Sequence, residues 1–135
     1  MMSSKALRFF SSSREVVLVS YARTPIATFS GSFSPLTGPS LASFAIQGAI
    51  TKASISPSDV QEAIFGNVVS AGMGQAPTRQ AILAAGLPNS VPATTVNKVC
   101  ASGMKAIMMA ASSILCGQQE IMLAGGFESM VMKII

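Results

Sequence analysis

Residues 97–106 (NKVCASGMKA) contain Cys100, the side chain with the clearest potential for chemistry in this sequence. Cys100 stands where an extended, β-branched segment gives way to a helical pattern, and the small residues Ala101, Ser102 and Gly103 follow it. The first N–H groups of a helix have no partner within the helix, and the helix dipole is positive at that end. Both effects favour a thiolate, the form in which cysteine acts as a nucleophile. The pattern therefore indicates covalent catalysis by Cys100.

A structural interpretation of Cys100 stays open beside the catalytic one. A lone cysteine in an apolar region is usually a small buried hydrophobe. The sequence also contains no histidine, so the usual base partner of a catalytic cysteine is missing from it. Cys116 falls at the other end of the same predicted helix, where the dipole disfavours a thiolate, and we interpret it as structural. Sixteen helical steps separate the two cysteines by about 24 Å, too far for a disulfide within the chain.

The remaining motifs indicate neither metal nor dinucleotide binding. Without histidine or a Cys-x-x-Cys pair, the sequence predicts no zinc site. Residues 72–77 (GMGQAP) have the glycine spacing of a dinucleotide-binding loop. However, Pro77 takes the third glycine position, and no acidic residue lies between Glu62 and Glu120. We therefore expect a tight turn there. Glu128 could act as an acid or base, but we favour a carboxylate that fixes a loop through backbone N–H groups.

The elements that must position Cys100 follow from the hydrophobic pattern. Apolar, β-branched runs alternate with helical patterns along the chain, which is typical of an α/β fold with a mixed, largely parallel sheet. The predicted strands cover residues 15–21, 63–70, 93–99 and 120–124. The predicted helices cover residues 41–53 with Ser40 as N-cap, a segment that runs from Pro77 to a stop at residues 86–88, and residues 101–115, with a turn at residues 56–59.

The predicted helix over residues 101–115 is apolar nearly all round, and Lys105 is its one charged residue. A helix without a polar face is buried on more than one side. We therefore expect a buried central helix that lies between two sheets, the second of which is not in this chain.

Composition points in the same direction. Half of the 135 residues are apolar and 10% are charged, whereas an ordinary globular domain is about 25% charged. A chain of this length has a small interior, so we expect a larger partner surface to cover part of it. A membrane span is not expected, because residues 99–123, the longest apolar stretch, are interrupted by Lys105, Gln118, Gln119 and Glu120.

The two ends of the chain have their own patterns. Residues 1–14 are basic, rich in serine and free of acidic residues, which is typical of a mitochondrial transit segment; the alternative is a disordered, mildly basic tail. The rest of the chain is nearly neutral and has no basic run with interleaved aromatic residues, so we expect no nucleic-acid partner. Residues 131–135 contain neither a turn signal nor a cap, and we interpret the chain as a truncated product.

Several segments together resemble the thiolase family. Residues 97–106 are similar to the acyl-enzyme signature of thiolases, and residues 126–130 (GFESM) resemble their Gly-x-Glu-Ser-Met segment. Residues 23–26, 66–68 and 74–80 fall in the order expected for the family. The resemblance implies that residues 15–130 form part of the N-terminal domain of a thiolase fold, with residues 131–135 as a non-matching tail.

The resemblance also implies a reaction. Cys100 would take the acyl group from acetyl-CoA or acetoacetyl-CoA as an enzyme thioester, and a second acetyl-CoA would accept it, which interconverts two acetyl-CoA with acetoacetyl-CoA and CoA. CoA thioesters would be substrates, with no bound cofactor. Thiolases carry their catalytic histidine, second cysteine and oxyanion hole in the C-terminal half, and no position here matches these groups. Only Cys100 carries over. The family further implies a homodimer or homotetramer, in the mitochondrial matrix or, alternatively, in the cytoplasm.

Three other interpretations remain open. The chain could be a non-catalytic fragment that associates with full-length thiolase subunits. It could instead descend from a condensing synthase of the same fold, which would differ in C-terminal residues that are not in this sequence. It could also be a fragment that does not fold stably, because its apolar content is high.

Overall fold

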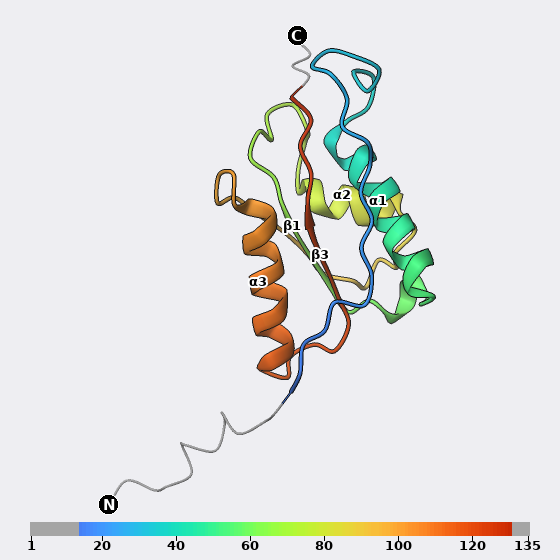
Figure 1. Cartoon of the computed structure of the whole chain (residues 1–135), viewed down its shortest axis with the longest axis vertical. Coiled ribbons are helices and arrows are strands. Elements are labelled where there is room, and N and C mark those ends of the chain that lie inside the picture. Colours follow the sequence, from blue (N-terminus) through green and yellow to red (C-terminus); the bar gives the residue numbers. More distant parts are fainter. Residues whose placement is uncertain (1–13, 131–135) are drawn as a thin grey trace, which may run out of the picture.

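The computed structural model of the chain describes residues 14–130 (Figure 1). The predicted transit segment over residues 1–14, apart from Arg14, and the predicted tail over residues 131–135 lie outside the described residues.

A parallel sheet of three strands forms the middle of the described chain. The strands are β1 (Glu62–Gly66), β2 (Ala93–Val96) and β3 (Met122–Gly126), and their spatial order is β2-β1-β3. Ala63 of β1 lies opposite Ala93 of β2 and Leu123 of β3. Both pairings are parallel, which confirms the prediction of an α/β fold with a largely parallel sheet.

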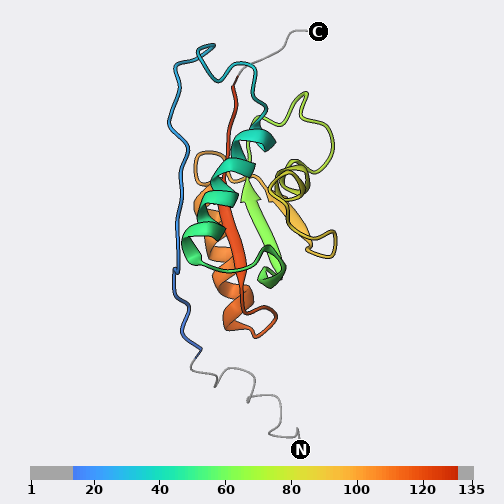
Figure 2. The same ribbon diagram turned by 90° about the vertical axis from the view of Figure 1, so that its right-hand side faces the viewer.

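Helices cover both faces of this sheet (Figures 1 and 2). Helices α1 (Gly38–Ala53) and α2 (Pro77–Ala84) pack against each other on one face. Helix α3 (Ser102–Leu115) packs against β1 and β3 on the opposite face. A short 3₁₀ helix, η2 (Pro57–Asp59), joins α1 to β1 at the predicted turn. The predicted strands and helices therefore occur in the expected order, with the exception of the first strand.

The main core lies between the sheet and the α1–α2 layer. Ile46 of α1 and Ile82 of α2 are fully buried there. Burial of a side chain of this size stabilises the folded state by roughly 1.5–3 kcal/mol. The buried residues that form this core are Ala42, Ile46, Ile50, Val60, Ala63, Phe65, Ala81, Ile82, Ala85, Leu87 and Val91.

Helix α1 begins three residues before the predicted start, and the predicted N-cap is wrong. The N-cap is Thr37, whose hydroxyl oxygen accepts a hydrogen bond from the amide of Ser40 at 3.3 Å. Pro39 occupies the first turn, where its missing N–H is not needed and its fixed φ suits a helix. Ser40 therefore lies inside the helix rather than before it.

Residues 15–21 are not a buried strand, which corrects the first of the predicted elements. The segment is extended but pairs with no strand, and Val17, Leu18 and Val19 are 64%, 79% and 72% exposed. Ser20 fastens it to α1 by donating a hydrogen bond from its hydroxyl to the carbonyl of Ala49 at 2.9 Å. A cavity of about 220 Å³ separates it from β3. The β-branched run therefore favours extension, but it pairs with no strand among residues 14–130.

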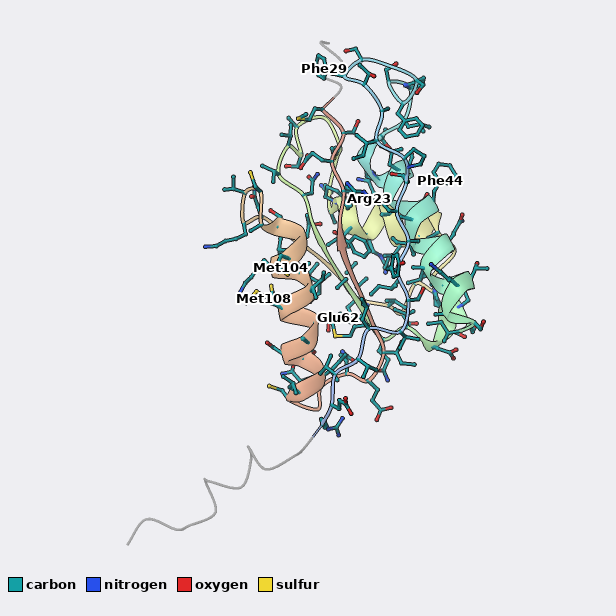
Figure 3. The ribbon with its side chains drawn as sticks, in the orientation of Figure 1. Arg23, Phe29, Phe44, Glu62, Met104 and Met108 are labelled. Atoms are coloured by element: carbon teal, nitrogen blue, oxygen red, sulfur yellow. The ribbon has the colours of Figure 1, made fainter. Side chains whose placement is uncertain are left out.

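Helix α3 buries only its inner side in the described part of the chain. Ala106 and Ala110 are buried against the sheet. Met104, Ile107 and Met108 on the outer side are 61%, 44% and 56% exposed, and Figure 3 shows Met104 and Met108 pointing away from the sheet. The sequence predicts a second sheet over this outer side that is not in this chain, and residues 14–130 accordingly leave it uncovered. An apolar helix face is therefore exposed.

Candidate active site

Cys100 lies in the turn that joins β2 to α3. Helix α3 begins at Ser102, one residue later than predicted, with Ala101 as its N-cap residue, so Cys100 lies immediately before the cap. Its side chain is exposed, and the interpretation of Cys100 as a buried hydrophobe is therefore wrong. Cys116, the C-cap residue of α3, is exposed as well. The same helix thus presents one thiol at each end.

The backbone of the turn is unusual at Val99. This residue has a φ of 52°, in the left-handed region that a β-branched residue rarely adopts. The amide of Val99 donates to the side-chain oxygen of Asn97 at 2.9 Å, and the amide of Ala101 donates to the carbonyl of Lys98 at 3.1 Å. These bonds reverse the chain between β2 and α3, so that the predicted strand over residues 93–99 ends at Val96.

Ser102 is the buried polar group of this turn. It is 4% exposed, and its hydroxyl donates to the carbonyl of Val99 at 2.6 Å. The same oxygen accepts a hydrogen bond from the amide of Lys98 at 2.7 Å. The side chain of Ser102 therefore links the two residues that precede Cys100 to the first residue of the helix.

Glycines bring the start of α3 close to the sheet. A Cβ atom built on Gly66, the last residue of β1, would lie 2.6 Å from the amide nitrogen of Gly103. A Cβ atom on Gly126, the last residue of β3, would lie 3.1 Å from the Cα atom of Gly103. Since side chains at either strand end would push the helix away, these glycines set how deeply the N-terminus of α3 sits.

Glu128 ties the loop after β1 to the segment after β3. Its carboxylate accepts hydrogen bonds from the amides of Val68 and Val69 at 3.0 and 2.9 Å, and from the side-chain amide of Asn67 at 3.1 Å. This confirms the interpretation of Glu128 as a loop-fixing carboxylate. It also explains why β1 ends at Gly66 and not at Ser70, because these amides bond to a side chain instead of a strand.

Asn67 connects all three strand ends. Its backbone amide donates to the carbonyl of Val96 at 3.0 Å, and its side-chain amide also donates to the carbonyl of Phe127 at 3.1 Å. Asn67 is 3% exposed, and its side-chain oxygen has no hydrogen-bond partner. The carboxyl ends of the strands therefore form a cross-linked edge beside the turn that carries Cys100.

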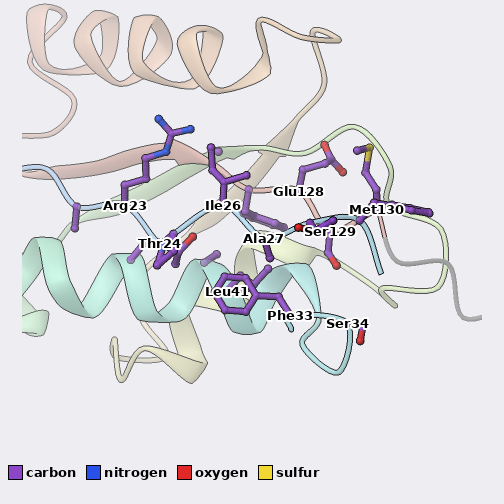
Figure 4. A pocket seen from close by; sticks show the side chains of 18 residues that line it. Arg23, Thr24, Ile26, Ala27, Phe33, Ser34, Leu41, Glu128, Ser129 and Met130 are labelled. Atoms are coloured by element: carbon purple, nitrogen blue, oxygen red, sulfur yellow. The ribbon is translucent and has the colours of Figure 1, made fainter. Parts of the chain in front are cut away.

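A cavity lies between the extended segment, the start of α1 and the segment after β3 (Figure 4). Its volume is about 420 Å³, and the extended segment with Arg23, the start of α1 with Leu41 and the segment with Glu128 line it. Cys100 is not among its lining residues. The cavity therefore borders the segment after β3 that contains Glu128, and not the turn that carries Cys100.

Residues 72–77 form the tight loop that the sequence predicts. Gly72 and Gly74 have φ angles of 74° and 78°, and the side-chain amide of Gln80 donates to the carbonyls of Met73 and Gln75 at 2.7 Å each.

Among residues 14–130, no cluster of three or more His, Cys, Asp or Glu side chains has a metal-binding arrangement. No helix in the same range is long and apolar enough to cross a membrane.

Sequence reasoning missed Ser102 and Asn67. A serine two residues after a candidate nucleophile at a helix start, and an asparagine directly after a buried strand, are the signals that could have found them. Neither signal predicts which groups form hydrogen bonds with these side chains.

Comparison with known proteins decides the family. The model of the thiolase N-terminal domain matches residues 16–134, which is most of the chain. The chain belongs to the thiolase family. It is 63% identical over 117 residues to the human mitochondrial acetyl-CoA acetyltransferase, and these residues are 87% of this chain and 27% of that protein. It is also 63% identical to the bovine mitochondrial acetyl-CoA acetyltransferase over 116 residues, 86% of this chain and 28% of that one.

Solved thiolase structures share the fold of this chain. The Acat5 thiolase from Ascaris suum, in complex with coenzyme A, superposes with a TM-score of 0.82 and 42% sequence identity. The match covers 84% of this chain and 30% of the Ascaris chain. This thiolase chain therefore spans between a quarter and a third of the length of the relatives that it matches.

Proposed function

We propose that this chain takes part in thiolase-type acyl transfer, with Cys100 as the nucleophile that carries the acyl group. The observation that supports this most is the exposed position of the Cys100 thiol directly before α3. The positive end of a helix dipole favours an anion at such a position. The family of the chain supports the choice of a thioester substrate.

The first step would be acylation of Cys100. Its thiolate sulfur attacks the carbonyl carbon of acetyl-CoA, the bond from this carbon to the CoA sulfur breaks, and CoA leaves as a thiolate. In the second step, the methyl carbanion of another acetyl-CoA attacks the acetyl group on Cys100. This forms acetoacetyl-CoA and releases the Cys100 thiolate. The two half-reactions predict ping-pong kinetics for the complete enzyme.

The second step needs a base for the methyl proton, and the sequence offers no histidine for this purpose. A missing general base slows a reaction by typically 10²–10⁴-fold. We infer that this chain supplies the acyl-carrying cysteine, and that further thiolase residues, from this protein or another subunit, supply the proton transfers. The mitochondrial relatives support a place in the mitochondrial matrix, and the family supports assembly as a homodimer or homotetramer.

Intact-mass spectrometry after incubation with acetyl-CoA tests this proposal. We expect one acetyl adduct on the chain, its loss in Cys100→Ala, and its retention in the matched control Cys116→Ala. An adduct that survives Cys100→Ala and disappears in Cys116→Ala would contradict the proposal. So would the absence of any adduct in a chain that unfolds with a cooperative thermal transition.

The outer face of α3 favours a second candidate, a non-catalytic chain that associates with full-length thiolase subunits. Met104, Ile107 and Met108 expose apolar surface that a partner would cover. Size-exclusion chromatography with and without an intact thiolase tests this, because a mixed species is required. Elution of the two proteins as separate peaks would contradict it.

A further inference from the structure

We propose that Ser102 is a positioning residue, whose hydroxyl holds Cys100 at the start of α3. This inference rests on the proposed role of Cys100 as the nucleophile. Ser102 touches neither the reacting atoms nor the Cys100 sulfur in our account, and it acts through the backbone of the turn.

The hydrogen bonds of Ser102 close a small ring around Cys100. The hydroxyl accepts from the amide of Lys98 at 2.7 Å and donates to the carbonyl of Val99 at 2.6 Å, and both of these residues precede Cys100. The side chain is 4% exposed, so water competes little for either bond. The single oxygen therefore fixes the position of the peptide groups on the strand side of the nucleophile.

The ring holds Val99 in a strained backbone conformation that would otherwise relax. Val99 has a φ of 52°, which crowds the Cβ atom of an L-residue, most of all a β-branched one. The backbone amide of Ser102 also donates to the Val99 carbonyl at 3.0 Å, and the Val99 amide donates to Asn97 at 2.9 Å, so the hydroxyl acts together with these bonds. Without the bonds of the hydroxyl, we expect Val99 to rotate toward negative φ. Such a rotation would move Cys100, the next residue, relative to the start of α3.

Ser102 can serve as the fixed point because its own backbone cannot move toward the sheet. A Cβ atom built on Gly66 would lie 2.6 Å from the Cβ atom of Ser102, so β1 and the helix start are already in close contact. The contact with Gly66 thus sets the position of Ser102, and the hydrogen bonds of its hydroxyl set the position of the turn.

The test compares the alkylation rates of the two thiols in each full-length variant by peptide mass spectrometry with iodoacetamide. The rate of each cysteine in the native variant is divided by its rate in the same variant unfolded in urea. This ratio reports how the fold changes the reactivity of each thiol and removes the reactivity of the unfolded peptide. Cys116, at the far end of α3, is the reference within the same molecule.

We expect the Cys100 ratio to exceed the Cys116 ratio in the unmodified chain and to fall by roughly tenfold in Ser102→Ala, while the Cys116 ratio stays unchanged. The double variant Ser102→Ala/Val99→Gly should recover the Cys100 ratio, because glycine adopts positive φ without strain. Ser112→Ala is the matched control, since Ser112 also bonds a carbonyl within α3, that of Met108, far from the turn.

A Cys100 ratio in Ser102→Ala within about twofold of the unmodified chain would overturn this inference and leave the proposed function standing. A Cys100 ratio equal to that of Cys116 in the unmodified chain would overturn both. If Ser102→Ala alone does not fold, the double variant decides. Recovery of the Cys100 ratio in the double variant then supports the positioning role. A Cys100 ratio that stays at the value of the urea-unfolded chain overturns it.

Discussion

Gly66 and Ser102 are in such close contact that a Cβ atom on Gly66 would lie 2.6 Å from the Cβ atom of Ser102. This contact joins the last residue of β1 to the first residue of α3, the helix that follows Cys100. Because the added atom would also meet backbone, namely the carbonyl carbon of Ser102 and, at 2.6 Å, the amide nitrogen of Gly103, the helix cannot give way locally. The depth of α3 on the sheet is therefore determined by the absence of a side chain at residue 66.

We predict that Gly66→Ala destabilises the chain by about 1–3 kcal/mol, because the added methyl group must push α3 away from β1. Gly103→Ala is the matched control on the other side of the contact. A Cβ atom there would meet Gly126 at an ordinary 3.7 Å, and alanine favours the helix. Its free energy of unfolding should change by less than about 1 kcal/mol. Urea unfolding measures both changes, and equal stability of the two variants would contradict the prediction.

The second prediction concerns the carboxylate of Glu128. Glu128→Ala removes the acceptor of the Val68 and Val69 amides, so we expect both amides to exchange with deuterium roughly tenfold faster. The loss in the free energy of unfolding should be about 1 kcal/mol, because water can replace the lost partner at this exposed site.

Hydrogen exchange followed by NMR measures the effect of Glu128→Ala residue by residue. The amide of Ile64, in the middle of β1, should keep its protection. Glu120→Ala, another exposed acidic residue, is the control and should leave Val68 and Val69 unchanged. Unchanged exchange at both valine amides in Glu128→Ala would show that the carboxylate does not hold this loop.

A third prediction follows from the outer face of α3. Replacement of Met104 and Met108 by glutamate removes exposed apolar surface, so the double variant should self-associate less and bind less of an apolar fluorescent dye. Lys105→Glu changes a charge on the same helix without removing apolar surface, and it serves as the control. Analytical ultracentrifugation at several concentrations measures association. Equal behaviour of the two variants would mean that charge, and not apolar contact, governs it.

The sequence alone predicts the α/β architecture because helical and strand patterns are local. The strands β1, β2 and β3 could be found in this way, and so could the place of Cys100 near the start of α3. The same β-branched pattern misleads at residues 15–21, because it favours an extended conformation but does not supply a paired neighbour. The predicted ends of β1 and β2 are too late, whereas that of β3 is two residues too early. For β1 the reason is tertiary, because Glu128, far along the chain, accepts hydrogen bonds from the Val68 and Val69 amides.

Local choices between similar residues were harder to predict. Thr37 and Ser40 are both good N-cap residues, and Pro39 decides between them through its place in the first turn. The role of Ser102 depends on a left-handed Val99, a backbone conformation that residue type does not announce. The contacts that hold the candidate site are therefore tertiary, whereas the candidate nucleophile itself follows from its local setting.

The most direct test of our account is where acetyl-CoA places its acetyl group. We would incubate the native chain with acetyl-CoA near neutral pH, and measure the acetylated fractions of Cys100 and Cys116 by peptide mass spectrometry, with the urea-unfolded chain as reference. Our account predicts at least roughly tenfold more acetyl on Cys100 in the native chain, and equal fractions in urea, because only the folded chain has the helix N-terminus. Equal acetylation of both cysteines in the native chain would contradict the central claim that the fold makes Cys100 a nucleophile.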